Sequence, residues 1–294
     1  MSGPTYSLTV IIAAHNSAEL IPGCLGSVVS QLTPIDRVVV VDDGSTDSTA
    51  VLAAELGAEV VRNPVPQGPY AARNAGADKS SSDGLIFFDT RCVAGAGWLE
   101  SHRALLSAGQ HSLSYGEVTV AGGDRLAEGL IRDIQPFAIS NYADHEYLPY
   151  FPTCNLGVRR SAFVAVKGFK QVRSGGDADF CWRVQEAGEG PIGLEYDNLV
   201  DWRPRKYMKQ LMEQFVRYGV STVQLNVSRG TRVRLVKRAV LSPLRIGKRL
   251  FTGAVRHPAK PSMALGSALI CACYEAGFLS QALRELQAKW RKGL

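Results

Sequence analysis

Short, uninterrupted apolar runs rich in β-branched residues recur through residues 8–88 and are separated by segments with helical periodicity. A strand that is covered on both faces has such a run, because neither of its faces meets water. The predicted strands are Leu8–Ala14, Arg37–Val41, Glu59–Arg62 and Gly84–Phe88. The predicted helices are Ala18–Gln31, capped by His15-Asn16-Ser17, Thr46–Leu56, which stops at Gly57, and Tyr70–Asp78.

This alternation predicts an α/β fold with a mostly parallel central sheet of the nucleotide-binding type, flanked by helices. Ligands bind to such sheets beyond the carboxyl ends of the strands. Four polar residues fall at those ends, namely Asn16, Asp42, Asp43 and Asp89.

The rhythm becomes irregular from Gly116 onward. The segments predicted there are a strand at Asn155–Val158, a helical turn at Ser161–Val166, and helices at Asp177–Ala187 and Lys206–Tyr218. Beyond Ser228, helical segments are predicted to be interrupted by Pro243, Gly247, Pro258 and Pro261. The apolar stretch Met263–Tyr274 is too short to span a bilayer alone.

Charge is unevenly distributed along the 294 residues, of which 46% are hydrophobic and 20% charged. Residues 1–213 carry a net charge of −7 and residues 214–294 carry +13, and no acid occurs between Glu213 and Glu275. Such a run favours an anionic partner surface, although a solvated basic face has the same composition. Stacking aromatic residues are not interleaved with these cations, which argues against nucleic acid and favours a membrane surface.

The first residues, Met1–Ser7, lack the basic and apolar regions of a secretory signal. The six cysteines form no Cys-x-x-Cys pair and are expected to be reduced, mostly buried thiols. We therefore expect a cytoplasmic protein, peripheral on the inner face of the cell membrane.

Three segments contain residues suited to chemistry. Asp42 and Asp43 can accept hydrogen bonds from a base or a ribose, or form a simple Asp-Gly turn. Arg73, in a helix that follows a Gly-Pro turn, can pair with a diphosphate or orient an acid at a neighbouring strand end, or it is an ordinary surface arginine. Asp177 can take a proton from a hydroxyl or cap a helix, whereas Asp179 is expected to pair with Arg183.

Taken together, these segments resemble a family 2 glycosyltransferase of the GT-A fold. The matching pieces run in order over residues 6–225: VIIAAHN, VVVVDDGSTDST, GPYAARNAG, FFDTRC followed by Trp98-Leu99, CNLGVRRSAF, Lys167-Gly168-Phe169, GGDADFCWRVQEAG, and Trp202-Arg-Pro-Arg with Gln214–Gly219. The resemblance implies a catalytic domain at 1–225, with a nucleotide-binding half at 1–110 and an acceptor-binding half at 111–225. Residues 226–294 would form a basic helical extension.

The resemblance also implies roles for individual positions. A nucleotide-sugar donor, preferably a UDP-sugar, would be bound by Ala13, Asn16, Asp42, Asp43, Arg73 and Asp89, and Arg91 is added to this donor site on the separate hypothesis given below. Asp177 would be the base of an inverting hexosyl transfer used in glycan, glycolipid or cell-envelope synthesis. The acceptor hydroxyl would be bound near Asn155, Gly176, Gln214, Arg217 and Tyr218, and the basic tail favours an acceptor that is lipid-linked.

Two positions depart from the pattern of the family. Arg91 stands where the second acid of an Asp-x-Asp element is expected, and Trp202 stands where many relatives carry a histidine. Asp89 is then the one candidate ligand for Mg²⁺ or Mn²⁺, and weak or absent metal dependence is expected. Our hypothesis is that Arg91, with Arg73, replaces part of the metal's work; the alternative is that Arg91 faces solvent while Asp89 alone holds a weakly bound metal.

Other classes of protein remain as alternatives. The altered Asp-x-Arg element is also compatible with a non-catalytic nucleotide-sugar-binding pseudoenzyme. A nucleotidyltransferase would require a Gly-rich basic loop after the first strand, and Ala13-Ala14-His15-Asn16 is not one. A glycoside hydrolase with paired carboxylates is disfavoured, because the acids lie at positions typical of a nucleotide site.

Overall fold

The computed structural model describes residues 5–229 and 241–291 of the chain. Two predictions from the sequence fall partly outside these ranges: the absence of a signal sequence, which used residues 1–4, and the basic extension, which includes residues 230–240. The four predicted strands of the first half are all present. They are β1 (Leu8–Ala14), β2 (Arg37–Asp43), β3 (Glu59–Asn63) and β4 (Gly84–Asp89), and they run parallel in the order β3-β2-β1-β4. Strands β2 and β4 continue far enough to include the acids at their carboxyl ends.

The helices between these strands are α1 (Ile21–Val29), α2 (Thr49–Glu55) and α3 (Pro69–Asp78). The predicted cap of the first helix is wrong, because α1 starts after Leu20 without a side-chain cap. The Ser17 hydroxyl donates instead to the His15 carbonyl, and the Ser17 carbonyl accepts the amides of Leu20 and Ile21. Residues 15–20 therefore form a turn before the helix begins.

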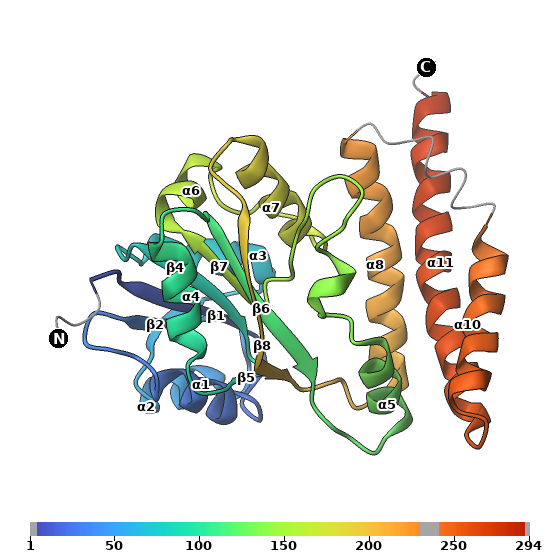
Figure 1. Ribbon diagram of the computed structural model, residues 1–294, viewed down its shortest axis with the longest axis horizontal. Coiled ribbons are helices and arrows are strands. Elements are labelled where there is room, and N and C mark those ends of the chain that lie inside the picture. Colours follow the sequence, from blue (N-terminus) through green and yellow to red (C-terminus); the bar gives the residue numbers. More distant parts are fainter. Residues whose placement is uncertain (1–4, 230–240, 292–294) are drawn as a thin grey trace. The chain divides into compact units, whose positions relative to one another are not determined.

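The second half of the sheet contains β5 (Cys92–Ala94), β6 (Leu113–Val120), β7 (Asn155–Arg159) and β8 (Ile192–Trp202), and the eight strands have the order β3-β2-β1-β4-β7-β6-β8-β5. Strand β7 is antiparallel to both β4 and β6. Figure 1 shows the helices on either side of this sheet, which gives the α/β class expected from the sequence. The pattern along the chain did not predict β5, β6 or β8.

The remaining elements of this half are α4 (Trp98–Ser107), α6 (Arg160–Ala165), α7 (Gly176–Glu186) and a short 3-10 turn, η1 (Ile139–Asn141). Four phenylalanines pack together where β4, α6 and α7 meet, and Phe87 is fully buried among them. The cluster is Phe87, Phe163, Phe169 and Phe180. It also contacts the ring of Tyr70 on α3, so α3 and α7 are fixed against the same strand.

The chain divides into two compact units, of which unit 1 is Met1–Ala121 with Gln135–Arg203 and unit 2 is Gly122–Ile134 with Pro204–Leu294. Unit 1 contains the sheet. Unit 2 contains α5 (Leu126–Ile134), α8 (Met208–Ser228), α10 (Ser242–Arg256) and α11 (Pro261–Arg291). Residues 204–225 thus group with the C-terminal helices, and the predicted functional halves at 1–110 and 111–225 stay predictions.

Glycines allow the helices of unit 2 to approach closely. A Cβ on Gly219 of α8 would lie 2.0 Å from the Tyr274 carbonyl oxygen, and one on Gly277 of α11 would lie 2.1 Å from the Val216 carbonyl oxygen. Glycine at both positions is therefore a condition of α8–α11 packing.

One predicted interruption of the C-terminal helices is wrong, because Gly247 lies within α10. Pro243 and Pro261 lie in the first turns of α10 and α11, where proline fits, and Pro258 lies between these two helices. The stretch considered too short for a membrane span continues into one 31-residue helix. Of the described residues, Pro261–Ala288 alone is long and apolar enough to cross a bilayer by length and composition, and 39% of its most apolar window is buried within the protein.

Candidate functional site

The ladder register brings several predicted site residues to one edge of the sheet. Ala13 pairs with Val41 of β2 on one side and with Asp89 of β4 on the other. Ala14 pairs with Asp42. The carboxyl ends of three adjacent parallel strands therefore meet at this edge, as expected for a ligand site in an α/β sheet.

The Asp43 carboxylate is occupied by its own chain. It accepts hydrogen bonds from the Asn63 side chain at 2.8 Å, the Gln67 amide at 2.9 Å and the Gly68 amide at 2.8 Å. Only 5% of the residue is exposed. Asp43 thus holds the loop between β3 and α3 against the strand edge, an organising role that the sequence did not show.

Asp42 is fully buried at the same strand end. Its carboxylate accepts the Ser45 amide at 3.1 Å and lies 3.2 Å from the Arg62 guanidinium, whose side chain is largely exposed. Gly44, which lies in the turn between Asp42 and Ser45, has φ +70, and a Cβ on it would lie 2.8 Å from Pro66. The Asp-Gly turn considered from the sequence is therefore present, and it closes tightly on the Asp43-bound loop.

Asn16 connects β1 to this turn. Its amide donates to the Ser45 hydroxyl at 2.9 Å, and its side-chain oxygen accepts the Thr46 amide at 2.9 Å. It has a left-handed backbone, with φ 46, which asparagine tolerates better than most residues. Asn16 is exposed beside the end of β1, and its place in a nucleotide pocket stays a prediction.

Arg73 and Asp89 form an ion pair at the centre of the edge. The Arg73 Nη2 donates to the Asp89 carboxylate at 2.7 Å. Arg73 is 5% exposed, whereas the Asp89 side chain is 36% exposed. Of the roles considered for Arg73, the structure shows the one in which it orients an acid at a neighbouring strand end.

Asp177 lies in the first turn of α7, half-buried and close to this ion pair. Its carboxylate accepts the Tyr70 hydroxyl at 3.2 Å and the Ala178 amide at 3.2 Å. Burial raises the pKa of Asp177 above its ordinary value, and the nearby Arg73 cation partly opposes that rise. A carboxylate with a raised pKa is a stronger base than an exposed one.

Tyr70 is a site residue that the sequence analysis missed. It is three residues before Arg73 on α3, so both side chains lie on one helix face, and the Arg73 guanidinium lies 5.6 Å from the ring centroid. Burial raises the pKa of its hydroxyl well above the ordinary value, so this group stays protonated and can donate to Asp177. A Cβ on Gly176 would meet the Tyr70 ring at 2.8 Å, so Gly176 makes room for this tyrosine.

Asp179 has the structural role expected for it. Its carboxylate accepts from Arg183 Nε at 2.7 Å and from Lys170 Nζ at 3.0 Å. These cations hold the pKa of Asp179 below its ordinary value although burial opposes them. The capping alternative for Asp177 is wrong, because α7 is capped by Gly175 without a side-chain bond.

The expectation that Asn155 binds the acceptor is wrong. Asn155 is fully buried, and its oxygen accepts from Trp98 Nε1 at 2.7 Å and from His102 Nε2 at 2.9 Å. Its amide donates to the Gly116 carbonyl at 3.0 Å. Every polar atom of this side chain is thus used to join α4 to β6 and β7 inside the core.

Arg91 follows Asp89 on the short link to β5. Its Nη1 donates to the Arg203 carbonyl at 3.4 Å, and its own carbonyl accepts the Arg203 amide at 2.8 Å. Trp202 is 3% exposed and packs on Phe137, away from solvent.

The residues present do not fit a preformed metal site. Over residues 5–229 and 241–291, no three His, Cys, Asp or Glu side chains gather as metal ligands. Asp89, the one candidate, already shares its charge with Arg73. A divalent cation is normally held by several oxygen ligands.

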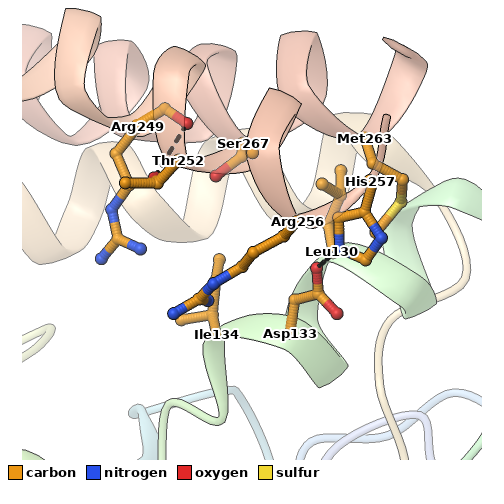
Figure 2. A pocket seen from close by; sticks show the side chains of 10 residues that line it. Leu130, Asp133, Ile134, Arg249, Thr252, Arg256, His257, Met263 and Ser267 are labelled. Carbon is orange, nitrogen blue, oxygen red and sulfur yellow. Dashed lines mark hydrogen bonds and ion pairs between the residues drawn. The ribbon is translucent and has the colours of Figure 1, made fainter. Parts of the chain in front are cut away.

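The remaining predicted residues, Gln214, Arg217 and Tyr218, belong to α8 in unit 2. Gln214 accepts from Arg205 at 3.1 Å and donates to the Tyr218 hydroxyl at 2.6 Å. A hollow between α5, α10 and α11 lies wholly in unit 2, where Asp133 contacts His257 (Figure 2). None of the predicted site residues lines it.

Comparisons with known proteins agree with this geometry. The sequence model described as "Glycosyl transferase family 2" matches residues 9–166. The pre-mycofactocin glycosyltransferase of Mycobacterium tuberculosis is 33% identical over 252 residues, which cover 78% of this chain and 52% of that protein. Glycosyltransferase AglE of Haloferax volcanii is 30% identical over 231 residues, covering 74% of this chain and 73% of that protein.

Solved structures share the fold at lower identity. A mannosyltransferase of Pyrobaculum calidifontis, in complex with GDP-Man and Mn²⁺, has a TM-score of 0.59 at 18% identity and covers 95% of this chain and 88% of its own. Residues 1–349 of S. aureus TarS give a TM-score of 0.53 at 16% identity, covering 98% and 92% of the two chains. This confirms the expected GT-A fold.

The chain spans about half the length, 52%, of the mycobacterial relative that it matches. The family match nevertheless covers more than half of this chain and includes β1 through β7. On these grounds the chain belongs to glycosyl transferase family 2.

Proposed function

We propose that this chain transfers a hexosyl group from a nucleotide-diphosphate sugar, preferably a UDP-sugar, to an acceptor hydroxyl with inversion. The observation that carries the proposal is the position of Arg73. It pairs with Asp89 at 2.7 Å and acts electrostatically on Asp177, which follows Asp89 by 88 residues in the chain. The acid of the expected donor site and the expected base thus share one cation.

In this mechanism Asp177 takes the proton of the acceptor hydroxyl. The acceptor oxygen then attacks the anomeric carbon while the bond from that carbon to the diphosphate oxygen breaks. The nucleoside diphosphate leaves with the bonding electrons. The Tyr70 hydroxyl, at 3.2 Å, fixes the Asp177 carboxylate without competing for the proton, because its own pKa is far higher.

The donor would bind along the edge formed by Ala13, Asn16 and Asp89. Because the Asp43 carboxylate already accepts three internal bonds, we assign its effect on the nucleotide to the loop that it holds. The leaving diphosphate carries negative charge that a divalent cation commonly offsets in related chemistry. We propose that arginines, Arg91 among them, supply part of that charge here.

The decisive experiment compares Asp177→Asn with Asp179→Asn, two identical changes within one helical turn. Asp177→Asn is expected to abolish transfer while donor binding, measured by calorimetry, stays within about twofold. It should not lower the free energy of unfolding at pH 7.5, since a raised carboxyl pKa means that ionisation opposes folding there. Asp179→Asn is expected to lower stability and retain transfer.

Transfer by Asp177→Asn at the wild-type rate would remove Asp177 from the role of base. A product that keeps the donor's anomeric configuration, read by NMR, would contradict inversion. If the wild type binds donors but turns over none of a panel of hydroxyl acceptors or water, the pseudoenzyme alternative would replace this proposal.

We also propose that α10 contacts an anionic membrane surface, which would suit a lipid-linked acceptor. Leu244, Phe251 and Val255 are 64–69% exposed and, with Lys248, follow a spacing of four, three and four residues along one face. α10 has no acidic residue, and Arg245 and Arg249 lie near this face. An exposed apolar stripe bordered by cations matches the interface of a bilayer with negative headgroups.

Flotation with phosphatidylserine-containing and pure phosphatidylcholine vesicles tests this contact. Leu244→Ser with Phe251→Ser should release the protein from the anionic vesicles, whereas Val51→Ser, an exposed apolar residue on α2, should not. Deleting residues 228–294 is a poorer test, because α8 packs against α11 and would be uncovered. Equal binding of all variants would overturn the assignment.

A further inference from the structure

Arg203 immediately follows β8 and carries a guanidinium for which neither the proposed reaction nor the family resemblance gives a role. The antiparallel ladder pairs Cys92 of β5 with Trp202 of β8, so the next pair joins Arg91 to Arg203. The Arg203 amide donates to Arg91 at 2.8 Å, and the Arg91 guanidinium donates to the Arg203 carbonyl at 3.4 Å. The backbone that presents Arg203 is thus held from both directions.

The Arg203 guanidinium lies against Gly23 in the first turn of α1. A Cβ on Gly23 would be 3.1 Å from its Nη2 and 3.6 Å from both Cζ and Nη1. Any side chain at position 23 would therefore displace the guanidinium. Figure 1 shows α1, β5 and the end of β8 together at this edge of the sheet.

The contact with α1 brings Arg203 close to the end of β4 that carries Asp89. Cys24, the residue after Gly23, donates its thiol to the Asp89 carbonyl at 3.3 Å. The charges of Asp89 and Arg203 both act on that thiol, although burial is the main reason that its pKa is raised. Arg203 is therefore a near neighbour of the donor edge and belongs to unit 1 with it.

Arg203 has no acidic partner of its own among the described residues, and Asp89 is already paired with Arg73. α1 has no side-chain cap and no acid in its first turn, so the positive end of its dipole adds to the guanidinium. Two positive groups side by side repel each other unless an anion lies between them.

Arg73 adds a further unsatisfied donor. It is 95% buried, and its Nε–H has no hydrogen-bond partner in the ranges that the structure describes. A buried N–H without a partner is unfavourable, because it has lost its hydrogen bonds to water. An anion with several acceptor oxygens beside the Arg73–Asp89 pair would satisfy this N–H.

We propose that Arg203, lying against Gly23 at the start of α1, binds the diphosphate of the donor and carries charge that a divalent cation carries in metal-dependent transferases. The proposal rests on the proposed function for the identity of the anion, but the anion site itself does not. Planar guanidinium binds paired phosphate oxygens in a fork that lysine does not reproduce.

The test uses the full chain in EDTA, with inorganic pyrophosphate and then UDP as probes in isothermal titration calorimetry. Arg203→Gln is expected to weaken pyrophosphate binding by about ten- to a hundredfold, as loss of a charge-assisted hydrogen bond does. Arg203→Lys should recover only part of this loss. Arg37→Gln, the same change at the amino end of β2 and so away from the donor edge, should have no effect.

Gly23→Ala is a second variant that separates binding from stability. Alanine is the better helix former, so the free energy of unfolding should not fall. Its Cβ should displace the guanidinium by a few tenths of an ångström and weaken pyrophosphate binding. Circular dichroism checks that all variants fold.

Three results would overturn the proposal: wild-type affinity in Arg203→Gln, no pyrophosphate binding by the wild type in EDTA, or binding that appears only when Mn²⁺ is added. If Arg203→Gln also transfers sugar with unchanged KM, the inference fails while the proposed function stands. If pyrophosphate binding depends on Arg203 but the wild type transfers no sugar, the proposed function fails and the anion site stands.

Discussion

Acidification should destabilise this protein through one buried histidine. His102 is 1% exposed, and its Nε2 faces the oxygen of Asn155, which can only accept. Nε2 must therefore carry the proton, and Nδ1 accepts from the Ser114 hydroxyl at 2.7 Å. A second ring proton, on Nδ1, would require the Ser114 hydroxyl to turn from donor to acceptor and would place a charge inside the core.

The magnitude follows from the pKa. Burial lowers the pKa of His102 from 6.5 to about 4. Stability from this group is fully present above pH 6.5 and is lost as the pH falls toward 4, because the unfolded chain binds the proton first. At pH 5 the loss relative to pH 7.5 is about 2 kcal/mol, from the two pKa values and the linkage relation.

Urea unfolding at pH 7.5, 6 and 5 measures this loss, with His102→Gln as the matched variant. Glutamine keeps one donor and one acceptor but does not titrate in this range. The variant should start less stable than the wild type and lose about 2 kcal/mol less between pH 7.5 and 5. Parallel pH profiles for the two proteins would refute the assignment of His102 as a buried, neutral group.

Three further changes test other parts of the structure. Asn155→Leu should lower the free energy of unfolding by about 3–5 kcal/mol, since the partners Trp98 and Gly116 lose their hydrogen bonds. At a temperature where the variant is folded, its KM for the acceptor should not change, and a selective rise in this KM would restore the binding role. Gly219→Ala should destabilise unit 2 by several kcal/mol, because its Cβ would meet backbone at 2.0 Å, whereas Gly247→Ala, in open space within α10, should stabilise it by about 0.5–1 kcal/mol. Thermal unfolding that ranks the two variants in the other order would contradict the α8–α11 packing. Arg73→Met should move the acidic limb of the transfer-rate profile to higher pH, since the cation that lowers the pKa of Asp177 is gone, and an unmoved limb would separate Arg73 from Asp177.

The first half of the fold could be predicted because each buried parallel strand is an apolar run ending in a polar residue. The ranges of β1 to β4 agree with the prediction to within two residues. Strand β8 was not predicted because Glu195, Asp197 and Asp201 interrupt its apolar residues, as is typical of a partly exposed strand. Its partner β5 has three residues, too few for any periodicity.

The site was predicted in outline but not in its connections. Adjacent strand ends placed Asp42 and Asp89 at one edge, because parallel strands share their carboxyl side. Ion pairs between side chains of different elements cannot be deduced in the same way, so the link from Arg73 to both Asp89 and Asp177 is seen only in the structure. Asn155 was misassigned because a polar residue at a strand start gives no sign of whether it faces solvent or a buried histidine.

The way Asp43 holds the loop before α3 has a consequence for redesign. Two of its three partners are the backbone amides of Gln67 and Gly68, which any residue except proline supplies. The residues between Asn63 and Gln67 can therefore be exchanged as a cassette of fixed length without loss of the anchor, provided that the close packing of Gly44 on Pro66 is kept. Under the proposed function, that interchangeable segment is where we would select variants that accept a different nucleotide base.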